Sequence, residues 1–174
     1  MQVRGCVAGC PIGGQRDFTS EHYFRVALER MRQSHSLYRE GDSYALAMYV
    51  AGVAVESMLR AYMLRRKREF ESRHDVLLLF KESGMLDVDP DMLKAKGMSD
   101  REIEAHLLAL RAAVSDVFIL WHNNYHYASE ARLLTHLKRM RLYRGAKGDL
   151  LKAKALQLLN AAQLFIDKGV LQWH

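Results

Sequence analysis

The segment from Trp121 to Tyr127 places several side chains that can move protons close together. It reads Trp-His-Asn-Asn-Tyr-His-Tyr, so that His122 and His126 lie four residues apart. On a continuing helix, residues at that spacing share one face, and Glu130 would extend this face. Imidazole titrates near neutral pH and serves as a general acid or base. His126 is therefore the candidate catalytic base, and His122 is its candidate companion.

The same two histidines have a spacing that can bind zinc. A zinc site needs a third protein ligand and usually a fourth, and neither is evident near His122 and His126. Cys6 and Cys10 are also four residues apart, but no second pair follows them. We therefore expect no metal site and no other cofactor.

The amides and aromatic rings of this segment have two interpretations each. Asn123 and Asn124 either cap a helix end, because Asn tolerates left-handed backbone angles, or contact a nucleotide. Tyr125 and Tyr127 are either core or interface aromatics, or platforms on which bases stack. Trp121 completes an apolar stripe and is expected in the core. Among these residues, Asn123 and Tyr127 are the candidate binding residues.

A second polar group occurs earlier in the chain. Glu56 lies between Val55 and Ser57, near the inward side of an expected helix. A partly buried carboxylate needs a partner, and Arg60 one turn later can supply it. The alternative places Glu56 and Arg60 in a polar binding cleft. His74 and Asp75 are expected to start a short helix, because a carboxylate favours a helix N-terminus.

The chain carries a formal net charge of +6, which favours acidic partners, with nucleic acid first among them. Its basic residues concentrate in two clusters. The first comprises Arg60, Arg65, Arg66, Lys67, Arg68 and Arg73, and the second Lys138, Arg139, Arg141, Arg144, Lys147, Lys152 and Lys154. They form either a phosphate-binding surface with salt-sensitive affinity or ordinary solvated helix faces.

Four long segments carry apolar residues in alternating steps of three and four, the pattern of amphipathic helices. They lie near residues 20–40, 44–62, 99–121 and 151–169, with Ser20 and the Ser99–Glu102 capping box marking two of their starts. The first stripe includes Phe24, Leu28 and Met31. The alanine-rich second helix is expected at the centre, because small residues let neighbouring helices approach closely. Shorter helices are expected at 76–83 and at 129–143, the latter with Leu133, Leu137 and Met140 inward, and 85–97 is expected to be irregular.

No run alternates every two residues as a half-buried strand does. The predicted fold class is all-α, an up-and-down four-helix bundle with one or two additional short helices. The 174 residues suit one domain, expected at 20–170 after a flexible leader at 1–19. The leader lacks the pattern of a signal peptide, and no apolar run is long enough to cross a bilayer. We therefore expect a cytoplasmic protein that does not associate with membranes.

Three motifs occur in a fixed order along the chain. They are the run Ala54–Ala61, with Glu56 at its centre, then His74-Asp75-Val76 ahead of three leucines, then Leu120–Tyr127. In this order they resemble the HEPN domain family, a helical family of prokaryotic nucleotide-binding proteins, toxins and defence ribonucleases. The resemblance covers roughly residues 20–165. It implies a homodimer that binds RNA or a nucleotide, beside a nucleotidyltransferase or antitoxin partner.

The chain departs from the motif that the ribonuclease members of this family share. They resemble one another in an Arg followed four to six residues later by a His, and two copies across a dimer interface form the site. Here Asn123 and His126 match the family's Asn and His, but His122 stands where Arg is expected. A neutral imidazole does not replace a permanently charged, forked guanidinium, so another basic residue such as Arg132 would have to do so.

Three functions are consistent with these residues. The first is a dimeric, HEPN-like module that binds a nucleotide or RNA, as part of a toxin–antitoxin or nucleotidyltransferase-associated system. The second is a metal-independent endoribonuclease with a variant active site. The third is a non-catalytic helical interaction domain.

Overall fold

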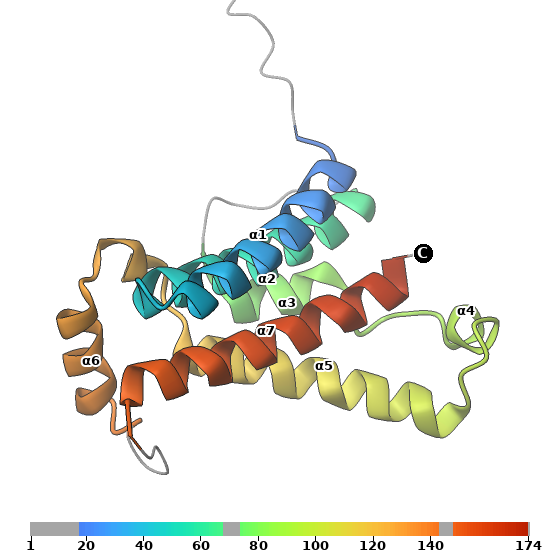
Figure 1. The fold of residues 1–174 in the computed structure, drawn as a ribbon. Helices are drawn as coiled ribbons and strands as arrows, with labels where there is room; N and C mark the ends of the chain where they lie inside the picture. Colours follow the sequence, from blue (N-terminus) through green and yellow to red (C-terminus); the bar gives the residue numbers. More distant parts are fainter. Residues whose placement is uncertain (1–17, 68–73, 143–147, 174) are drawn as a thin grey trace, which may run out of the picture.

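The computed structural model describes residues 18–67, 74–142 and 148–173, and within these ranges its regular elements are all helices (Figure 1). They are α1 (Ser20–Glu40), α2 (Tyr44–Arg65), α3 (Val76–Ser83), α4 (Pro90–Lys94), α5 (Asp100–Leu120), the 3-10 helix η1 (Asn123–Tyr127), α6 (Glu130–Arg139) and α7 (Leu150–Trp173). The expected all-α fold class is confirmed, with α1, α2, α5 and α7 as the four long helices. The expected leader lies almost entirely outside the described residues.

Helix α2 forms the centre of the bundle, as its alanine content predicts. Its residues Ala47, Ala51, Ala54 and Ala61 are fully buried, and α1 and α7 pack directly on it. Helix α5 packs on α7, and the short α3 contacts both α2 and α5. Helix α6 stands at one end of the bundle, beside the start of α7, and α4 lies at the other end (Figure 1). This arrangement leaves α6 as the least enclosed of the elements near the motif at residues 120–127.

Local signals explain most helix boundaries. Ser99 and Glu102 form the predicted capping box of α5, and Asp75 accepts a bond from the Leu78 N–H at the start of α3. Helix α1 differs from the prediction, because Thr19 rather than Ser20 is its N-cap. Its inward stripe also shifts, and Leu28 is 38% exposed.

Other differences from the expected elements lie in the second half of the chain. Residues Pro90–Lys94 form a short helix within the segment expected to be irregular. Helix α6 ends earlier than expected, which leaves Met140 55% exposed. Helix α7 continues past Gly169 to Trp173, whose ring stacks on Phe24 with the ring centroids 4.6 Å apart. These contacts could not be read from helical periodicity, since they join the two ends of the domain.

Candidate functional site

The position of the candidate motif depends on a close contact between α5 and α2. After α5 ends, Trp121 adopts an extended backbone conformation and its indole lies against Gly52 of α2. A Cβ atom at Gly52 would be 2.0 Å from the indole nitrogen. The Trp121 Nε1–H donates a hydrogen bond of 3.1 Å to the carbonyl of Tyr49. Trp121 is thereby fixed on α2, and it sets the starting point of His122.

The two histidines of the motif do not share a helical face, because the helix does not continue through them. His122 is the N-cap of η1, and its Nδ1 accepts a bond of 3.1 Å from the Asn124 N–H. His126 donates from Nδ1 to the Asn123 carbonyl, and its exposed ring lies beside Tyr49, with centroids 5.0 Å apart. Glu130, expected to extend the shared face, instead accepts a bond of 2.6 Å from the Tyr44 N–H at the start of α2.

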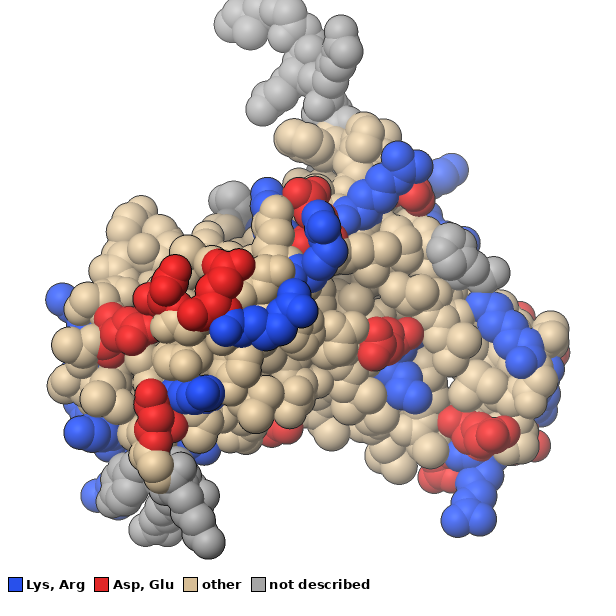
Figure 2. All heavy atoms as spheres, viewed as in Figure 1, with Lys and Arg blue, Asp and Glu red and all other residues tan. Residues whose placement is uncertain are grey.

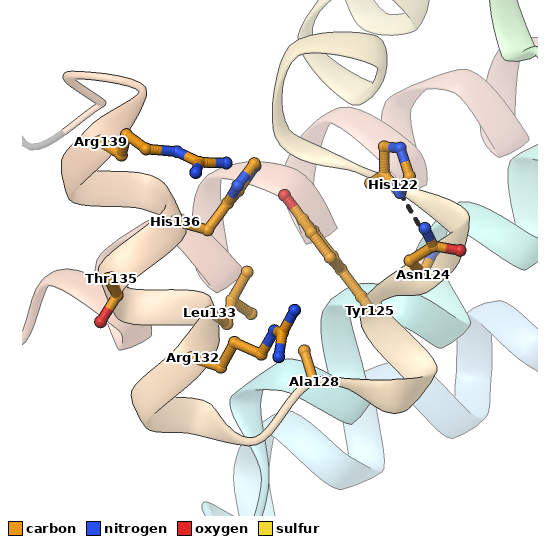
Figure 3. A pocket seen from close by; sticks show the side chains of 9 residues that line it. All are labelled: His122, Asn124, Tyr125, Ala128, Arg132, Leu133, Thr135, His136 and Arg139. Atoms are coloured by element: carbon orange, nitrogen blue, oxygen red, sulfur yellow. Dashed lines mark hydrogen bonds between the residues drawn. The ribbon is translucent and has the colours of Figure 1, made fainter.

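A pocket of about 430 Å³ lies between η1 and α6 (Figure 3). It is lined by His122, Asn124, Tyr125, Ala128, Arg132, Leu133, Thr135, His136 and Arg139. His136 and Arg139 extend from α6 toward the ring of Tyr125, whereas Thr135 turns away (Figure 3). The predicted residues His122 and Arg132 are therefore brought together. His126, Asn123 and Tyr127 do not line this pocket, and Tyr127 is 80% exposed.

The amphipathic character of α6 explains how its basic residues reach the pocket. Ser129 caps the helix by accepting a bond from the Arg132 N–H. Leu133 and Leu137 are buried and hold one side of α6 against the bundle. Arg132, His136 and Arg139 follow at steps of four and three, so they share the neighbouring side.

The pocket is electropositive. Its lining contains no Asp or Glu, and within the described ranges neither Arg132 nor Arg139 forms an ion pair with a carboxylate. Burial, together with the positive charge of Arg139 and the proximity of His122, lowers the pKa of His136. Burial raises the pKa of Tyr125 to about 12, so its hydroxyl stays protonated and can donate a hydrogen bond. The pocket thus offers two permanent cations and an imidazole that favours its neutral form.

Sequence reasoning missed His136 and Arg139 as parts of the site, although it named Arg132. The available signal was the spacing of these three residues along the polar side of α6. This spacing alone does not identify the site, because the sequence does not show that the polar side of α6 faces η1. Arg139 appeared only as a member of the second basic cluster.

Glu56 and Arg60 form the predicted pair, and the structure adds His74 as a third member. The Arg60 guanidinium lies 2.6 Å from Glu56 Oε1, and the His74 Nδ1 lies 2.8 Å from Glu56 Oε2. Glu56 is only 7% exposed, so its charge is compensated within the fold. The group lies outside the pocket between η1 and α6.

The first basic cluster makes contacts within the fold. Arg65 donates to the Trp173 carbonyl, and its guanidinium carbon lies 4.6 Å from the centre of the Trp173 ring. Arg66 bonds to the carboxylate and the carbonyl of Asp87, at 3.3 and 3.2 Å. Lys67 is exposed, and Arg68 and Arg73 lie outside the described residues. The three described arginines of this cluster are therefore engaged within the fold and do not form a free phosphate-binding surface.

One member of the second basic cluster, Arg139, lines the candidate pocket. Figure 2 shows Lys and Arg side chains along the edge where α6 and the start of α7 lie. The described members on these elements and the turn after α6 are Lys138, Arg139, Arg141, Lys152 and Lys154. Arg144 and Lys147 lie outside the described residues.

In the described part of the chain, no group of three or more His, Cys, Asp or Glu side chains is arranged to hold a metal ion. None of the helices in these ranges combines the length and the hydrophobicity that a membrane-spanning helix requires.

Comparison with known proteins bears on the framework of the site. The sequence matches the HEPN domain family over residues 20–116, which is more than half of the chain. No curated protein and no solved structure matches it significantly. The matched region contains α1 to α4 and most of α5, including the Glu56–Arg60–His74 group, and it ends before the pocket residues. Since the match covers more than half of the chain, with the central helix α2 inside it, the chain belongs to the HEPN domain family, whose members are generally connected with nucleotides and RNA.

Proposed function

We propose that this protein binds the phosphate groups of RNA or of a nucleotide in the pocket between η1 and α6. The observation that carries this proposal is the pair of guanidinium groups, Arg132 and Arg139, that line a pocket without any carboxylate. A guanidinium matches the geometry of a phosphate and makes charge-assisted hydrogen bonds to it. Leu133, Ala128 and Tyr125 supply apolar surface for the sugar or base of the same ligand.

A binding titration with a labelled single-stranded RNA tests this proposal. The variant Arg132→Ala/Arg139→Ala should weaken binding at low salt by at least about tenfold. It should also reduce the slope of log affinity against log salt by about 1.4, since each phosphate contact on a single strand contributes about 0.7. The matched control is Arg25→Ala/Arg111→Ala, which removes two exposed positive charges outside the pocket. Equal losses in both variants would show that only net charge matters and would refute a specific site.

A second candidate function is metal-independent cleavage of RNA, favoured by the two imidazoles in the same pocket. His136 has a lowered pKa and can accept the proton of a 2′-hydroxyl and then return a proton to the leaving 5′-oxygen, while the Nε2–H of His122 can donate a hydrogen bond to a phosphate oxygen. The attack on phosphorus would yield a 2′,3′-cyclic phosphate and a free 5′-hydroxyl. Arg132 would stabilise the phosphate charge in place of the missing Arg. His126, the base expected from the sequence, lies outside this pocket, so His136 takes that role in the proposal.

An RNA cleavage assay in the presence of EDTA tests the second function. Wild type and His126→Ala should produce cyclic phosphate ends, whereas His136→Ala and His122→Ala should not. RNA left intact by the wild type would exclude cleavage while leaving the binding proposal open to its own test. Cleavage by His136→Ala at the rate of wild type would exclude the assignment of the base.

We also propose, from the family resemblance, that the chain forms a homodimer. Its proposed partner is a nucleotidyltransferase or an antitoxin. Light scattering of the purified chain should give twice the monomer mass if the dimer forms. Absence of RNA and nucleotide binding at low salt would favour the third function, a helical interaction domain.

A further inference from the structure

A second hollow, of about 470 Å³, is lined by residues from the start of α3, the end of α5 and η1. It is lined by His74, Asp75, Val76, Phe118, Trp121, His122, Asn123 and Asn124. His122 and Asn124 line both hollows, so the two share one wall. We propose that the second hollow holds an adenine base whose 5′-phosphate lies in the α6 pocket. This inference rests on the proposed function and names the ligand class of that site.

The apolar side of the second hollow suits a flat aromatic ring. Phe118 is 49% exposed at the end of α5, and Trp121 and Val76 lie beside it in the lining. An exposed aromatic side chain in a concave site provides a surface on which a base stacks. Asp75 accepts the Leu78 N–H as the N-cap of α3 and is the one carboxylate in the lining.

The polar side of the hollow presents two imidazoles whose rings are held in place. The Nδ1–H of His74 donates to the buried Glu56 carboxylate, which fixes the orientation of this ring. The Nδ1 of His122 accepts the Asn124 N–H, which leaves Nε2–H as a donor. Each ring is therefore oriented by a bond on the protein side.

The asparagine amides of the lining distinguish adenine from its closest analogue. Adenine carries an amino donor at C6 beside the acceptor N7, whereas hypoxanthine carries acceptors at both places. One amide group, with its one acceptor and its donor, matches the adenine arrangement. The side-chain amides of Asn123 and Asn124 make no hydrogen bond within the described residues, and Asn is the side chain that pairs with the N6 and N7 edge of adenine. Binding sites that hydrogen-bond the edge of a base bind the matching base much more tightly than a mismatched one, because a mismatch leaves polar atoms of the site unpaired.

Calorimetric titration of the full chain with AMP, IMP, ribose 5-phosphate and inorganic phosphate tests the inference. AMP should bind about tenfold or more tightly than ribose 5-phosphate, and more tightly than IMP. Phe118→Ala should weaken AMP binding by about tenfold without changing the affinity for ribose 5-phosphate. Arg132→Ala should weaken the binding of both AMP and ribose 5-phosphate, because it removes a contact to the phosphate that both ligands carry. Phe118 is half exposed, so its removal should leave the melting temperature nearly unchanged, which circular dichroism verifies.

The outcomes separate this inference from the proposed function. If ribose 5-phosphate binds as tightly as AMP, or if Phe118→Ala binds AMP like wild type, the base site is refuted and the phosphate site stands. If IMP binds as tightly as AMP, the assignment of adenine is refuted. If neither AMP, ribose 5-phosphate nor RNA binds at low salt, both proposals are refuted. The variant Asn123→Ala, which changes the second hollow alone, should repeat the selective loss of AMP affinity.

Discussion

Replacement of Gly52 by alanine should destabilise the protein, although alanine is the better helix former. A Cβ atom at this position would lie 2.0, 2.1 and 2.2 Å from three atoms of the Trp121 indole. Ordinary carbon contacts are about 3.5 Å, so the indole would have to move by about 1.5 Å. Trp121 is 6% exposed and bonds to the Tyr49 carbonyl, so this movement disturbs a packed and hydrogen-bonded group.

The magnitude follows from three opposing effects. Overpacking a core destabilises by about 1–3 kcal/mol, and loss of the indole hydrogen bond by about 1 kcal/mol. The higher helix propensity of alanine offsets about 1 kcal/mol. The net loss for Gly52→Ala is about 2 kcal/mol, which lowers the melting temperature by about 4–8 °C for a domain of this size. RNA affinity should also fall, because Trp121 sets the position of His122 in the pocket.

Gly169→Ala is the matched control within α7. There the added Cβ would lie 3.1 Å from the Cγ and Sδ atoms of Met58, a flexible side chain that can adjust. Its free energy of unfolding in urea should stay within about 1 kcal/mol of wild type. Equal stability of Gly52→Ala and wild type, or equal destabilisation of both variants, would refute the role given to the Gly52–Trp121 contact.

Three further predictions concern titratable groups. Burial lowers the pKa of His106, whose ring nitrogens have no partner among the described residues. As the pH falls, the unfolded chain therefore binds a proton at this residue before the folded chain does. The free energy of unfolding should decrease as the pH drops below about 6.5. His106→Leu should flatten this decline in urea unfolding measured from pH 7.5 to 5, and an unchanged decline would contradict the assignment. Glu56→Ala should reduce stability by about 3 kcal/mol, because it removes a buried carboxylate that contacts both Arg60 and His74, whereas His74→Ala should reduce it by less than about 1 kcal/mol. A calorimetric scan of both variants that found equal losses would show that Arg60 does not depend on the carboxylate. The lowered pKa of His136 favours its neutral ring near pH 7, so RNA affinity should rise once the pH falls well below about 6.5, the usual pKa of histidine, and a third positive charge enters the pocket. Anisotropy titrations of His136→Gln should lack this rise.

Repeating patterns within single helices were predictable from the sequence. The small residues of α2 predict its central position, and the Ser99–Glu102 spacing predicts the start of α5. Each of these features depends on neighbours within one or two turns. The family relationship was likewise accessible, because its motifs are local.

Features that depend on distant partners were not predictable in the same way. Trp121 continues the apolar spacing of α5, so periodicity alone placed it inside the helix, whereas its contact with Gly52 takes it out. Arg65 and Arg66 look solvated in the sequence, but Trp173 and Asp87 hold them. Pairings between residues that lie from 21 to 108 positions apart have no signature in a single sequence.

The candidate pocket shows the same limit. The sequence indicated His122 and Arg132 as site residues. It also predicted that His122 and His126 share one face of a continuing α-helix, whereas the chain forms the 3-10 helix η1 there. His136 was overlooked because its environment is created by the turn that folds α6 back toward η1. The direction of that turn is set by the bond from Tyr44 to Glu130 and by two buried leucines.

Because few residues of α6 are buried, this helix should open locally, and a ligand in the pocket should oppose that opening. Only Leu133 and Leu137 of this helix are buried, whereas most of α2 is enclosed. Local opening of α6 therefore requires far less free energy than global unfolding, and its amide hydrogens should exchange with solvent well before those of α2. A ligand that bridges Arg132 and Arg139 to η1 would bind only the closed state, and it would slow exchange in α6 by a factor that reports its own affinity.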